Sequence, residues 1–441
     1  MSIESPTRHP LDWTDPDFSD PLKIDQELRR VFDICHGCRR CFNLCDSFPR
    51  LFDLIDASPT GELDSVDSKD FAPVVDACTL CDMCFMVKCP YVPPHELNVD
   101  FPHLMLRYRA AEFQKGKSSL VKAELAKTDR NGKIAGAIAP VANWATNASN
   151  PITRPLMGKV FGIHPKAAIP RFCGETLVRQ AAKTKPEINV DAPAYGQKVV
   201  IYATCFSNYN NPKIGLAAQA ILAHNGIEAE VVYPGCCGMP SLEQGDLAKV
   251  SINARAVAAA LRPWVDRGYA VIALIPSCAL MLKSEWPLIV TDDDNVKALS
   301  SVTKDISEYI VWLARSFGLV PGLKSLGEDI TLHIACHARA QNIGHKAAEM
   351  LRLIPQTQVD VIERCSGHGG TWGMEVDHFE VALKVGAPVA NQAIKNKNRL
   401  VVSECPLAGE HILQGIQKKI TDKDAFVTLH PIEILAQAYS L

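Results

Sequence analysis

Eight cysteines near the start of the chain have the residue type and the spacing needed to hold inorganic clusters. They form two runs, each with three cysteines two residues apart and a fourth further on: Cys35, Cys38, Cys41 and Cys45, then Cys78, Cys81, Cys84 and Cys89. Three cysteines at this spacing can wrap one face of a four-iron cubane, and the fourth ligand must come from elsewhere. The sequence therefore predicts two [4Fe–4S] clusters.

The fourth ligand of each cluster is expected to come from the other run, because this exchange is typical of two-cluster ferredoxins. One cluster would be held by Cys35, Cys38, Cys41 and Cys89, and the other by Cys78, Cys81, Cys84 and Cys45. Two zinc ribbons are the alternative, but zinc would leave the third cysteine of each run superfluous. The runs depart from the usual pattern at Asp46, where proline usually follows, and in the four residues that precede Cys89.

A second set of cysteines lies in the C-terminal half and occurs twice. In each copy a lone cysteine precedes a Cys-Cys-Gly or Cys-Ser-Gly turn and a later cysteine; the copies are Cys205, Cys236, Cys237 and Cys278, then Cys336, Cys365 and Cys405. Equivalent cysteines are 131, 129 and 127 residues apart, and a nearly constant offset is typical of a duplicated unit.

Strands alternating with helices must position these cysteines. Apolar, β-branched runs lead to them at 198–205, 228–234 and 269–278, and again at 330–336, 358–364 and 399–405. This alternation predicts parallel βαβ units, which carry ligands at the C-terminal ends of their strands. We therefore expect an α+β multidomain protein with an α-helical two-cluster ferredoxin domain (1–110), a linker with helical pieces (111–195) and two duplicated α/β lobes (196–322 and 323–441).

The cysteine order resembles a known family. A lone cysteine, then Cys236-Cys237-Gly238, then Cys278 is similar to the cysteine-rich CCG domain, which is paired in iron–sulfur oxidoreductases such as heterodisulfide reductase (its B and D subunits) and anaerobic glycerol-3-phosphate dehydrogenase (its C subunit). The resemblance covers residues 25–110 and 196–441, and it implies five cysteines per repeat around a non-cubane [4Fe–4S] cluster. This chain has Ile275 and Val402 where the last C-x-x-C pair would begin, and Ser366 in place of another cysteine.

These departures leave four candidate metal ligands in the first lobe and three in the second. Four cysteines can complete a cubane or a zinc site, whereas three leave one iron open or recruit another ligand. His337 and His368 lie beside the second set. We therefore expect catalysis in the second lobe, with Cys336, Cys365, Cys405 and His337 as its candidate residues. Reversible oxidation of metal-free thiols is the alternative for either lobe.

Composition narrows the class and the compartment. A net charge of -3 over 441 residues gives no basic field for nucleic acid. The chain has sixteen cysteines, many in tight spacings, which favours metal binding over disulfide bonds. Its start has no apolar signal segment, so we expect a cytoplasmic protein. Residues 134–163, which are mildly apolar and include Trp144, are interpreted as linker, with peripheral contact to the inner face of the cytoplasmic membrane as the alternative.

Together these features predict an electron-transfer oxidoreductase subunit. It would pass electrons between a partner dehydrogenase or redox protein and a disulfide, quinone or protein acceptor, and the resemblance implies that the partner is a flavoprotein. The alternative is a non-catalytic relay and docking module with zinc-bound or empty lobes. Arg39, Arg40 and Arg339 adjoin candidate ligands, where they could raise a reduction potential, bind an acidic partner or simply be solvated. Cys173 is interpreted as a spare buried thiol, and the glycines of 367–373 as a turn close to a cluster.

Overall fold

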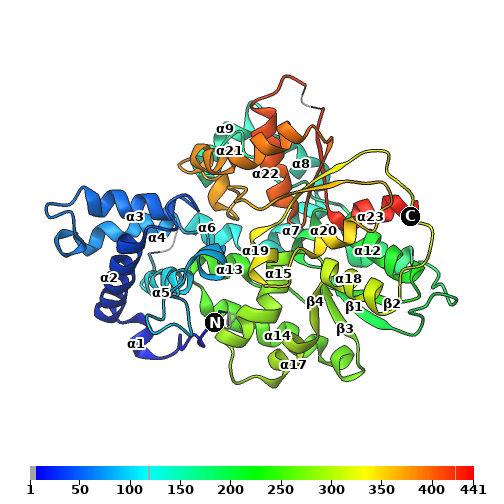
Figure 1. Ribbon diagram of the computed structural model, residues 1–441, viewed down its shortest axis with the longest axis horizontal. Helices are drawn as coiled ribbons and strands as arrows, with labels where there is room; N and C mark the ends of the chain where they lie inside the picture. The colour runs from blue at the N-terminus through cyan, green and yellow to red at the C-terminus, as the bar shows by residue number, and fades with distance from the viewer. Residues whose placement is uncertain (1–5, 118–119, 423) are drawn as a thin grey trace.

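The helices and strands fall into four consecutive groups along the chain (Figure 1). This computed structural model describes residues 6–117, 120–422 and 424–441. An N-terminal group of helices, at the left of Figure 1, is followed by a second helical group and then by two α/β lobes. The predicted mixture of helices and two parallel sheets is confirmed.

The N-terminal helices flank both runs of cysteines. They are α1 (Pro16–Ser19), α2 (Pro21–Cys38), α3 (Ser47–Asp56), α4 (Ala72–Asp76) and α5 (Phe101–Gln114), with the short turns η1 (Leu63–Ser65), η2 (Ser68–Phe71) and η3 (Cys84–Lys88). Asp20 caps α2 by accepting hydrogen bonds from the backbone N–H groups of Leu22 and Lys23 at 2.8 and 3.0 Å. Packed aromatic rings, such as Phe48 and Phe101 with centroids 4.7 Å apart, hold the group together. Its identity as a two-cluster ferredoxin remains a prediction.

The segment predicted as a linker consists of helices packed on both lobes. They are α6 (Leu120–Leu125), α7 (Thr128–Ala137), α8 (Ala139–Thr146), α9 (Thr153–Phe161) and α10 (Leu177–Lys183). Arg154 on α9 is 1% exposed, and its guanidinium donates to the carbonyls of His164, Pro165 and Ala167 at 3.0, 2.9 and 2.5 Å. A Cβ on Gly132 of α7 would lie 2.5 Å from the ring of Tyr209 in the first lobe. The segment is therefore held directly against its neighbours.

The first lobe is a parallel four-stranded sheet in the order β2-β1-β3-β4, covered by helices. Its elements are β1 (Lys198–Tyr202), α11 (Cys205–Tyr209), α12 (Pro212–His224), β2 (Glu228–Val232), α13 (Met239–Gln244), α14 (Leu247–Asp266), β3 (Ala270–Ala273), α15 (Pro276–Leu280), η4 (Met281–Glu285), α16 (Trp286–Ile289), α17 (Asp294–Val302), β4 (Thr303–Asp305) and α18 (Ile306–Ser316). The central strand β1 is fully buried beyond its first residue, which explains its continuous apolar run.

The second lobe repeats this topology with the order β6-β5-β7-β8. Its elements are β5 (Ile330–His333), α19 (Cys336–Ala340), α20 (Lys346–Leu351), β6 (Val359–Ile362), η5 (Trp372–Met374), α21 (Phe379–Asn396), β7 (Leu400–Ser403), α22 (Pro406–Gln417), β8 (Val427–Leu429) and α23 (Pro431–Tyr439). The registers correspond, since Val199 pairs with Ala229 and Ala270 where Ile330 pairs with Val359 and Leu400. The duplication predicted from the cysteine offsets is confirmed at the level of strands.

The two lobes are joined by helices that cross between them. The C-terminal helix α23 packs on α12 of the first lobe, and α18 packs on α20 of the second. The Tyr439 hydroxyl donates to the carbonyl of Val320 at 2.8 Å, and its ring lies 4.6 Å from that of His224. In the described ranges, no helix combines the length and apolar character needed to span a bilayer.

Candidate redox site

The cysteines of the duplicated set lie just beyond strand ends, as predicted for parallel sheets. Cys205 and Cys336 begin α11 and α19, directly after the central strands β1 and β5. The others follow the neighbouring strands: Cys236 and Cys237 after β2, Cys278 after β3, Cys365 after β6 and Cys405 after β7. Each lobe thereby gathers its thiols at one edge of its sheet.

The four thiols of the first lobe form two close pairs. The sulfur atoms of Cys205 and Cys236 are 3.9 Å apart, and those of Cys237 and Cys278 are 3.3 Å apart. The backbone N–H of Gly238 donates to the Cys236 sulfur at 3.4 Å. The pKa of Cys236 lies well below its ordinary value, chiefly because of its hydrogen bond with Cys205. Asp129 of α7 accepts from the Cys236 backbone N–H at 3.2 Å, so the second helical group helps to shape this site.

The three thiols of the second lobe include a hydrogen-bonded pair, Cys336 and Cys365. A hydrogen bond with Cys336 lowers the pKa of Cys365 to about 7 against the effect of burial, and the Gly367 N–H adds to this at 3.3 Å from the sulfur. The pKa of Cys336 is raised in turn, first by Cys365 and then by Cys81 of the N-terminal group. Burial raises the pKa of Cys405 to about 11. The second lobe therefore adjoins the second N-terminal run.

His337 lies where three parts of the chain meet. Its Nδ1 is 2.8 Å from the Ser277 hydroxyl of the first lobe, and its Nε2 is 3.4 Å from the Leu80 carbonyl of the N-terminal group. Burial lowers its pKa, which favours the neutral imidazole. Both ring nitrogens thus have partners, and the ring joins the second lobe to the other two parts.

The positions where the family resemblance expects further cysteines are also buried. Val402 in β7 is 0% exposed, Ile275 before α15 is 7% exposed, and Ser366 is 5% exposed. The first two are apolar and pack in the cores of the lobes. The cysteine sets are therefore incomplete in space as well as in sequence.

The eight N-terminal cysteines separate into two groups in space. After the larger effect of burial, Cys89, Cys41 and Cys38 raise the pKa of Cys35. In the same way, Cys81 and Cys78 raise the pKa of Cys45 after burial. Coulombic effects of this kind fall with distance and identify neighbours. These neighbours are those that the crossed assignment expects for Cys35 and Cys45, and the assignment itself stays a prediction.

The loop that carries the second run has an unusual backbone. Leu80 and Asp82 adopt positive φ angles of 48° and 64°, which residues other than glycine rarely adopt. Asp82 is 4% exposed and pairs with Arg8 from the start of the described chain. Such a conformation persists only where its surroundings enforce it, and here Arg8 supplies part of that restraint.

The donor chemistry of the N-terminal groups fits iron–sulfur clusters. Burial, followed by neighbouring thiols, raises the pKa of Cys41 to about 12, and burial raises the pKa of Cys78 to about 11. Gathering several thiolates here therefore needs compensating positive charge, which bound iron supplies. Among the residues that the structure describes, no three His, Cys, Asp or Glu side chains already converge on the position of one metal ion.

A cavity of about 370 Å³ lies between the N-terminal group and the two lobes. Thiols from all three parts line it: Cys81, Cys205, Cys237, Cys278, Cys336, Cys365 and Cys405. Cys278 also raises the pKa of Cys405, after larger effects of burial and backbone hydrogen bonds, so the sites of the two lobes face each other. The structure thus brings six of the seven predicted lobe cysteines, all but Cys236, and one cysteine of the second run to a common space.

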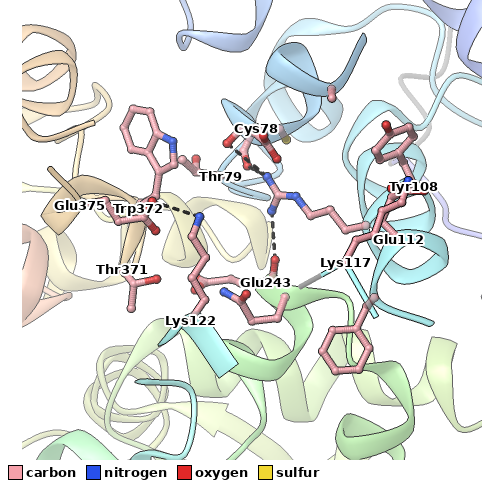
Figure 2. A pocket seen from close by; sticks show the side chains of 16 residues that line it. Cys78, Thr79, Tyr108, Glu112, Lys117, Lys122, Glu243, Thr371, Trp372 and Glu375 are labelled. Carbon is pink, nitrogen blue, oxygen red and sulfur yellow. Dashed lines mark hydrogen bonds and ion pairs between the residues drawn. The ribbon is translucent and has the colours of Figure 1, made fainter. Parts of the chain in front are cut away.

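A neighbouring pocket holds charged residues that the sequence did not single out (Figure 2). Arg109 of α5 donates to the carbonyls of Val75 at 2.7 Å, Glu243 at 3.2 Å and Cys78. Burial raises the pKa of the Glu243 side chain to about 7, although Arg109 opposes this. Across the pocket, Lys122 pairs with Glu375 at 3.0 Å. Arg109 therefore ties the second cysteine run to the first lobe, and no periodic sequence signal announces such a contact.

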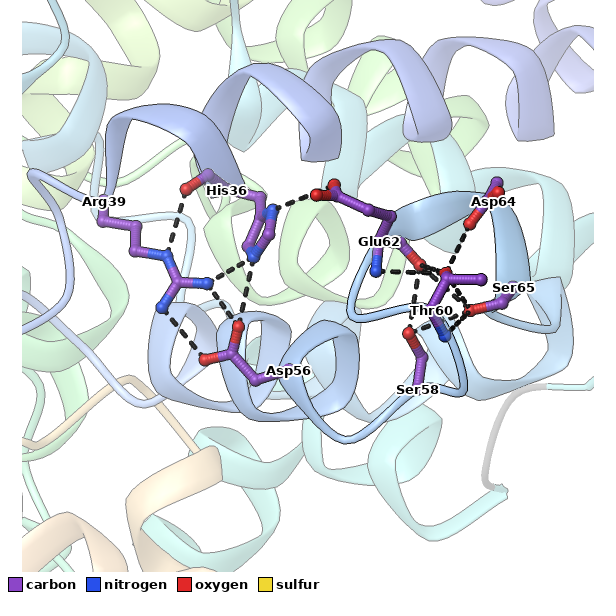
Figure 3. Close-up of polar contacts among 8 residues, drawn as sticks. All are labelled: His36, Arg39, Asp56, Ser58, Thr60, Glu62, Asp64 and Ser65. Atoms are coloured by element: carbon purple, nitrogen blue, oxygen red, sulfur yellow. Dashed lines mark hydrogen bonds and ion pairs between the residues drawn. The ribbon is translucent and has the colours of Figure 1, made fainter.

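The three arginines beside candidate ligands differ in their surroundings. Arg39 pairs with Asp56 at 2.9 Å, and His36 lies 3.2 Å from the same carboxylate (Figure 3). Arg339 is 14% exposed and lowers the pKa of Cys365, after the larger effects named above. Arg40 is exposed and lowers the pKa of Cys41, but this effect is smaller than the opposing effect of burial. Arg39 and Arg40 are thus both exposed beside thiols of the first run, whereas Arg339 is largely buried.

Gly367 allows the loop after Cys365 to touch the backbone of α21. Its φ is +78°, and a Cβ there would lie 2.0 Å from the Ala382 carbonyl oxygen. The close approach expected at this glycine is therefore to a helix. A Cβ on Gly369 would instead lie 2.6 Å from the side chain of Thr79, in the second run.

We expect Gly367→Ala to destabilise the protein by about 2–4 kcal/mol, because a clash with backbone adds to the cost of the left-handed conformation. Gly318→Ala is the matched control, since its φ is +81° and nothing lies within 4 Å of its Cβ position. Urea unfolding under anaerobic conditions measures both. Equal losses in the two variants would show that the contact with α21 adds nothing.

Family comparison agrees with this arrangement. Residues 199–283 and 330–409 each match the family model described as the cysteine-rich domain, CCG. Two segments of the chain therefore match the cysteine-rich domain, and the resemblance predicted from Cys236-Cys237-Gly238 is confirmed.

Among curated proteins, the chain is 26% identical over 331 residues to the C subunit of the anaerobic glycerol-3-phosphate dehydrogenase of Escherichia coli, covering 74% of this chain and 79% of the relative. It is 25% identical over 255 residues to the B subunit of the fumarate reductase (CoM/CoB) of Methanothermobacter marburgensis, covering 56% and 47%. It is 24% identical over 211 residues to the lactate utilization protein A of Bacillus pumilus, covering 45% and 80%. By their names, the first two are subunits of oxidoreductases, which agrees with the redox class predicted from the cysteines.

Proposed function

We propose that the chain is the iron–sulfur electron-transfer subunit of a cytoplasmic oxidoreductase, associated peripherally with the inner face of the membrane. It works beside a flavoprotein dehydrogenase and passes electrons between that partner and a disulfide, quinone or protein acceptor. The two N-terminal groups of cysteines would hold [4Fe–4S] clusters, and the lobes would hold one or two further clusters. Bound clusters would supply one-electron transfer. The redox names of the relatives support this class of function.

The observation that carries the proposal is the contact between the N-terminal cysteines and the second lobe. Cys81 raises the pKa of Cys336, and Cys365 raises that of Cys45, in each case with other thiols and burial. Two redox sites in one chain serve a relay only if they adjoin. The second group of N-terminal cysteines (Cys78, Cys81, Cys84 and Cys45) adjoins the thiols that we assign to acceptor chemistry. Those thiols are Cys336, Cys365 and Cys405. His337 is a positioning residue in this scheme, because it bonds to both neighbours of its lobe.

We expect a protein partner to bind near the first group of N-terminal cysteines, which are Cys35, Cys38, Cys41 and Cys89. Phe42 follows Cys41 and Val87 lies in η3 just before Cys89; both are exposed apolar residues, and Arg40 and Lys88 are exposed beside them. An apolar centre with positive neighbours suits a partner with a complementary acidic surface. The proposed order is therefore partner, first group, second group and second lobe.

A second candidate function rests on the incomplete cysteine sets. Because Val402 and Ile275 fill two expected ligand positions, the lobes could hold zinc or no metal and serve as a docking platform for a relay. Iron, acid-labile sulfide and zinc per chain separate the two functions. Two clusters account for about eight irons, so about eight irons with zinc favour the docking platform and about twelve or more favour redox lobes.

The proposed route predicts that Cys336→Ala slows electron delivery at least about tenfold while leaving the N-terminal clusters intact. Holoprotein reduced with dithionite and freed of excess reductant is mixed anaerobically with a water-soluble naphthoquinone or oxidised glutathione, and cluster absorbance is followed. Cys173→Ala is the matched control, since that thiol lies outside both sets and its Sγ bonds the Asn210 carbonyl at 3.3 Å. Unchanged rates in Cys336→Ala with both acceptors would exclude the second lobe from the route.

A further inference from the structure

The helices α7, α8 and α9 present an unusual number of large apolar side chains to solvent. Eight residues, each at least 47% exposed, make up what we term the α7–α9 apolar surface: Ile134, Ile138, Val141, Trp144, Ile152, Leu156, Val160 and Phe161. Single exposed apolar residues are ordinary in proteins, whereas a group of this size on adjoining helices marks an interaction site.

The spacing of these residues places them on helix faces. Ile138, Val141 and Trp144 recur every three residues along α8, and Ile152, Leu156 and Val160 recur every four residues into and along α9. Residues three and four apart share one face of a helix. Each helix therefore carries an apolar stripe, and α8 packs against both α7 and α9, which places the stripes on neighbouring elements.

The opposite sides of these helices are already packed. Arg154 of α9 is buried against the carbonyls of 164–167, Met157 belongs to a small core with Phe379 of α21, and the side chain of Asn143 on α8 donates to the Phe172 carbonyl at 2.9 Å. The stripes are therefore held outward by a fixed scaffold. They are not a face that turns inward to complete the core.

Charge distinguishes between possible occupants of this surface. Residues 130–174 contain six Lys or Arg residues and no Asp or Glu. Five of the six are exposed: Arg130, Lys133, Lys159, Lys166 and Arg171. Apolar stripes with an interfacial tryptophan, in a segment whose charged residues are all basic, are the composition of helices that lie in the surface of an anionic bilayer.

We propose that the α7–α9 apolar surface docks the protein on anionic phospholipid, with its apolar residues inserted at the level of the headgroups. The proposal rests on the proposed function for its role, since it identifies the element that would hold the subunit at the membrane. Its geometry is independent of any bound cluster. Association is reversible, because the buried area is that of short helices lying in the interface rather than of a spanning segment.

Vesicle flotation of the anaerobically purified holoprotein tests this directly. Vesicles of phosphatidylcholine mixed with phosphatidylglycerol should carry the protein, and vesicles of phosphatidylcholine alone should carry at least about tenfold less. Ile138→Glu with Val141→Glu should abolish flotation, whereas the control Ile252→Glu, at a 61% exposed isoleucine on α14, should not. Lys159→Glu with Lys166→Glu should weaken it, and Lys249→Glu with Lys297→Glu should leave it unchanged.

Brominated lipids add a readout of depth, because bromine quenches tryptophan fluorescence only at close range. Quenching of the wild-type protein should fall in Trp144→Phe, which still floats. The proposal is overturned if the α8 substitutions leave flotation unchanged, or if the protein floats equally well with neutral and with anionic vesicles. A wild-type dimer that the α8 substitutions convert to monomer, with no flotation, would instead assign this surface to a second copy. Iron content and cluster reduction are measured in parallel, so a failure of the electron-transfer function is recognised separately.

Discussion

Cys89→Ala is expected to damage the cluster of the first cysteine run rather than that of its own run. Cys89 is among the thiols that raise the pKa of Cys35 and Cys41, whereas Cys45 is surrounded by Cys81 and Cys78. The variant should lose about one to four irons per chain, depending on whether the damaged cluster survives in part.

Double variants decide which cluster is damaged. If Cys89 and Cys38 serve one cluster, Cys89→Ala with Cys38→Ala should lose little more iron than either single variant. Cys89→Ala with Cys81→Ala should instead damage both clusters. Iron, sulfide and the electron paramagnetic resonance of the reduced protein report this, with Cys173→Ala as the control. The reverse pattern of additivity would mean that each run binds its own cluster.

Arg8→Met is expected to destabilise the protein by about 3–5 kcal/mol, since it leaves buried carboxylates without their cation. The Arg8 guanidinium contacts Asp82, Asp100 and Glu285 at 2.6, 3.0 and 2.9 Å, and the side chains of Asp82 and Glu285 are 6% and 3% exposed. Anaerobic urea unfolding measures the loss. Because Asp82 lies between Cys81 and Cys84, iron retention in the second run should fall as well.

Two further variants show whether charge is the cause. Arg30→Met removes an exposed ion pair with Glu27 and should cost less than about 1 kcal/mol. Glu285→Gln combined with Arg8→Met should recover part of the stability lost in Arg8→Met. If Arg8→Met is no worse than Arg30→Met, the buried network does not stabilise the fold and the restraint on the Asp82 backbone must come from elsewhere.

The features that follow from local sequence could be predicted. Continuous apolar runs specify buried parallel strands, and the constant offsets specify a duplicated topology, so the placement of Cys205 and Cys336 after strand ends follows from residue order. The central position of those strands in each sheet was not predicted. The helical flanks of the first cysteine run follow in the same way from caps such as Asp20.

Contacts between distant segments could not be predicted from one sequence. Arg8 meets Glu285, Asp129 meets Cys236, and His337 meets Ser277, across separations that no local pattern encodes. The exposed stripes of α8 and α9 were also hidden, because the same apolar spacing would arise if those faces were packed. Their orientation depends on Arg154, whose burial the sequence does not announce.

The crossing helices between the lobes have a consequence for electron tunnelling. Since α23 packs on the first lobe and Tyr439 is bonded to Val320, the sheets cannot swing apart without breaking a packed core. Cys278 and Cys405 are therefore mounted at a fixed separation on a rigid frame. Tunnelling rates fall steeply with distance and with the structural rearrangement that accompanies each charge shift. A rigid frame of this kind would hold the distance between clusters bound in the two lobes constant from one turnover to the next.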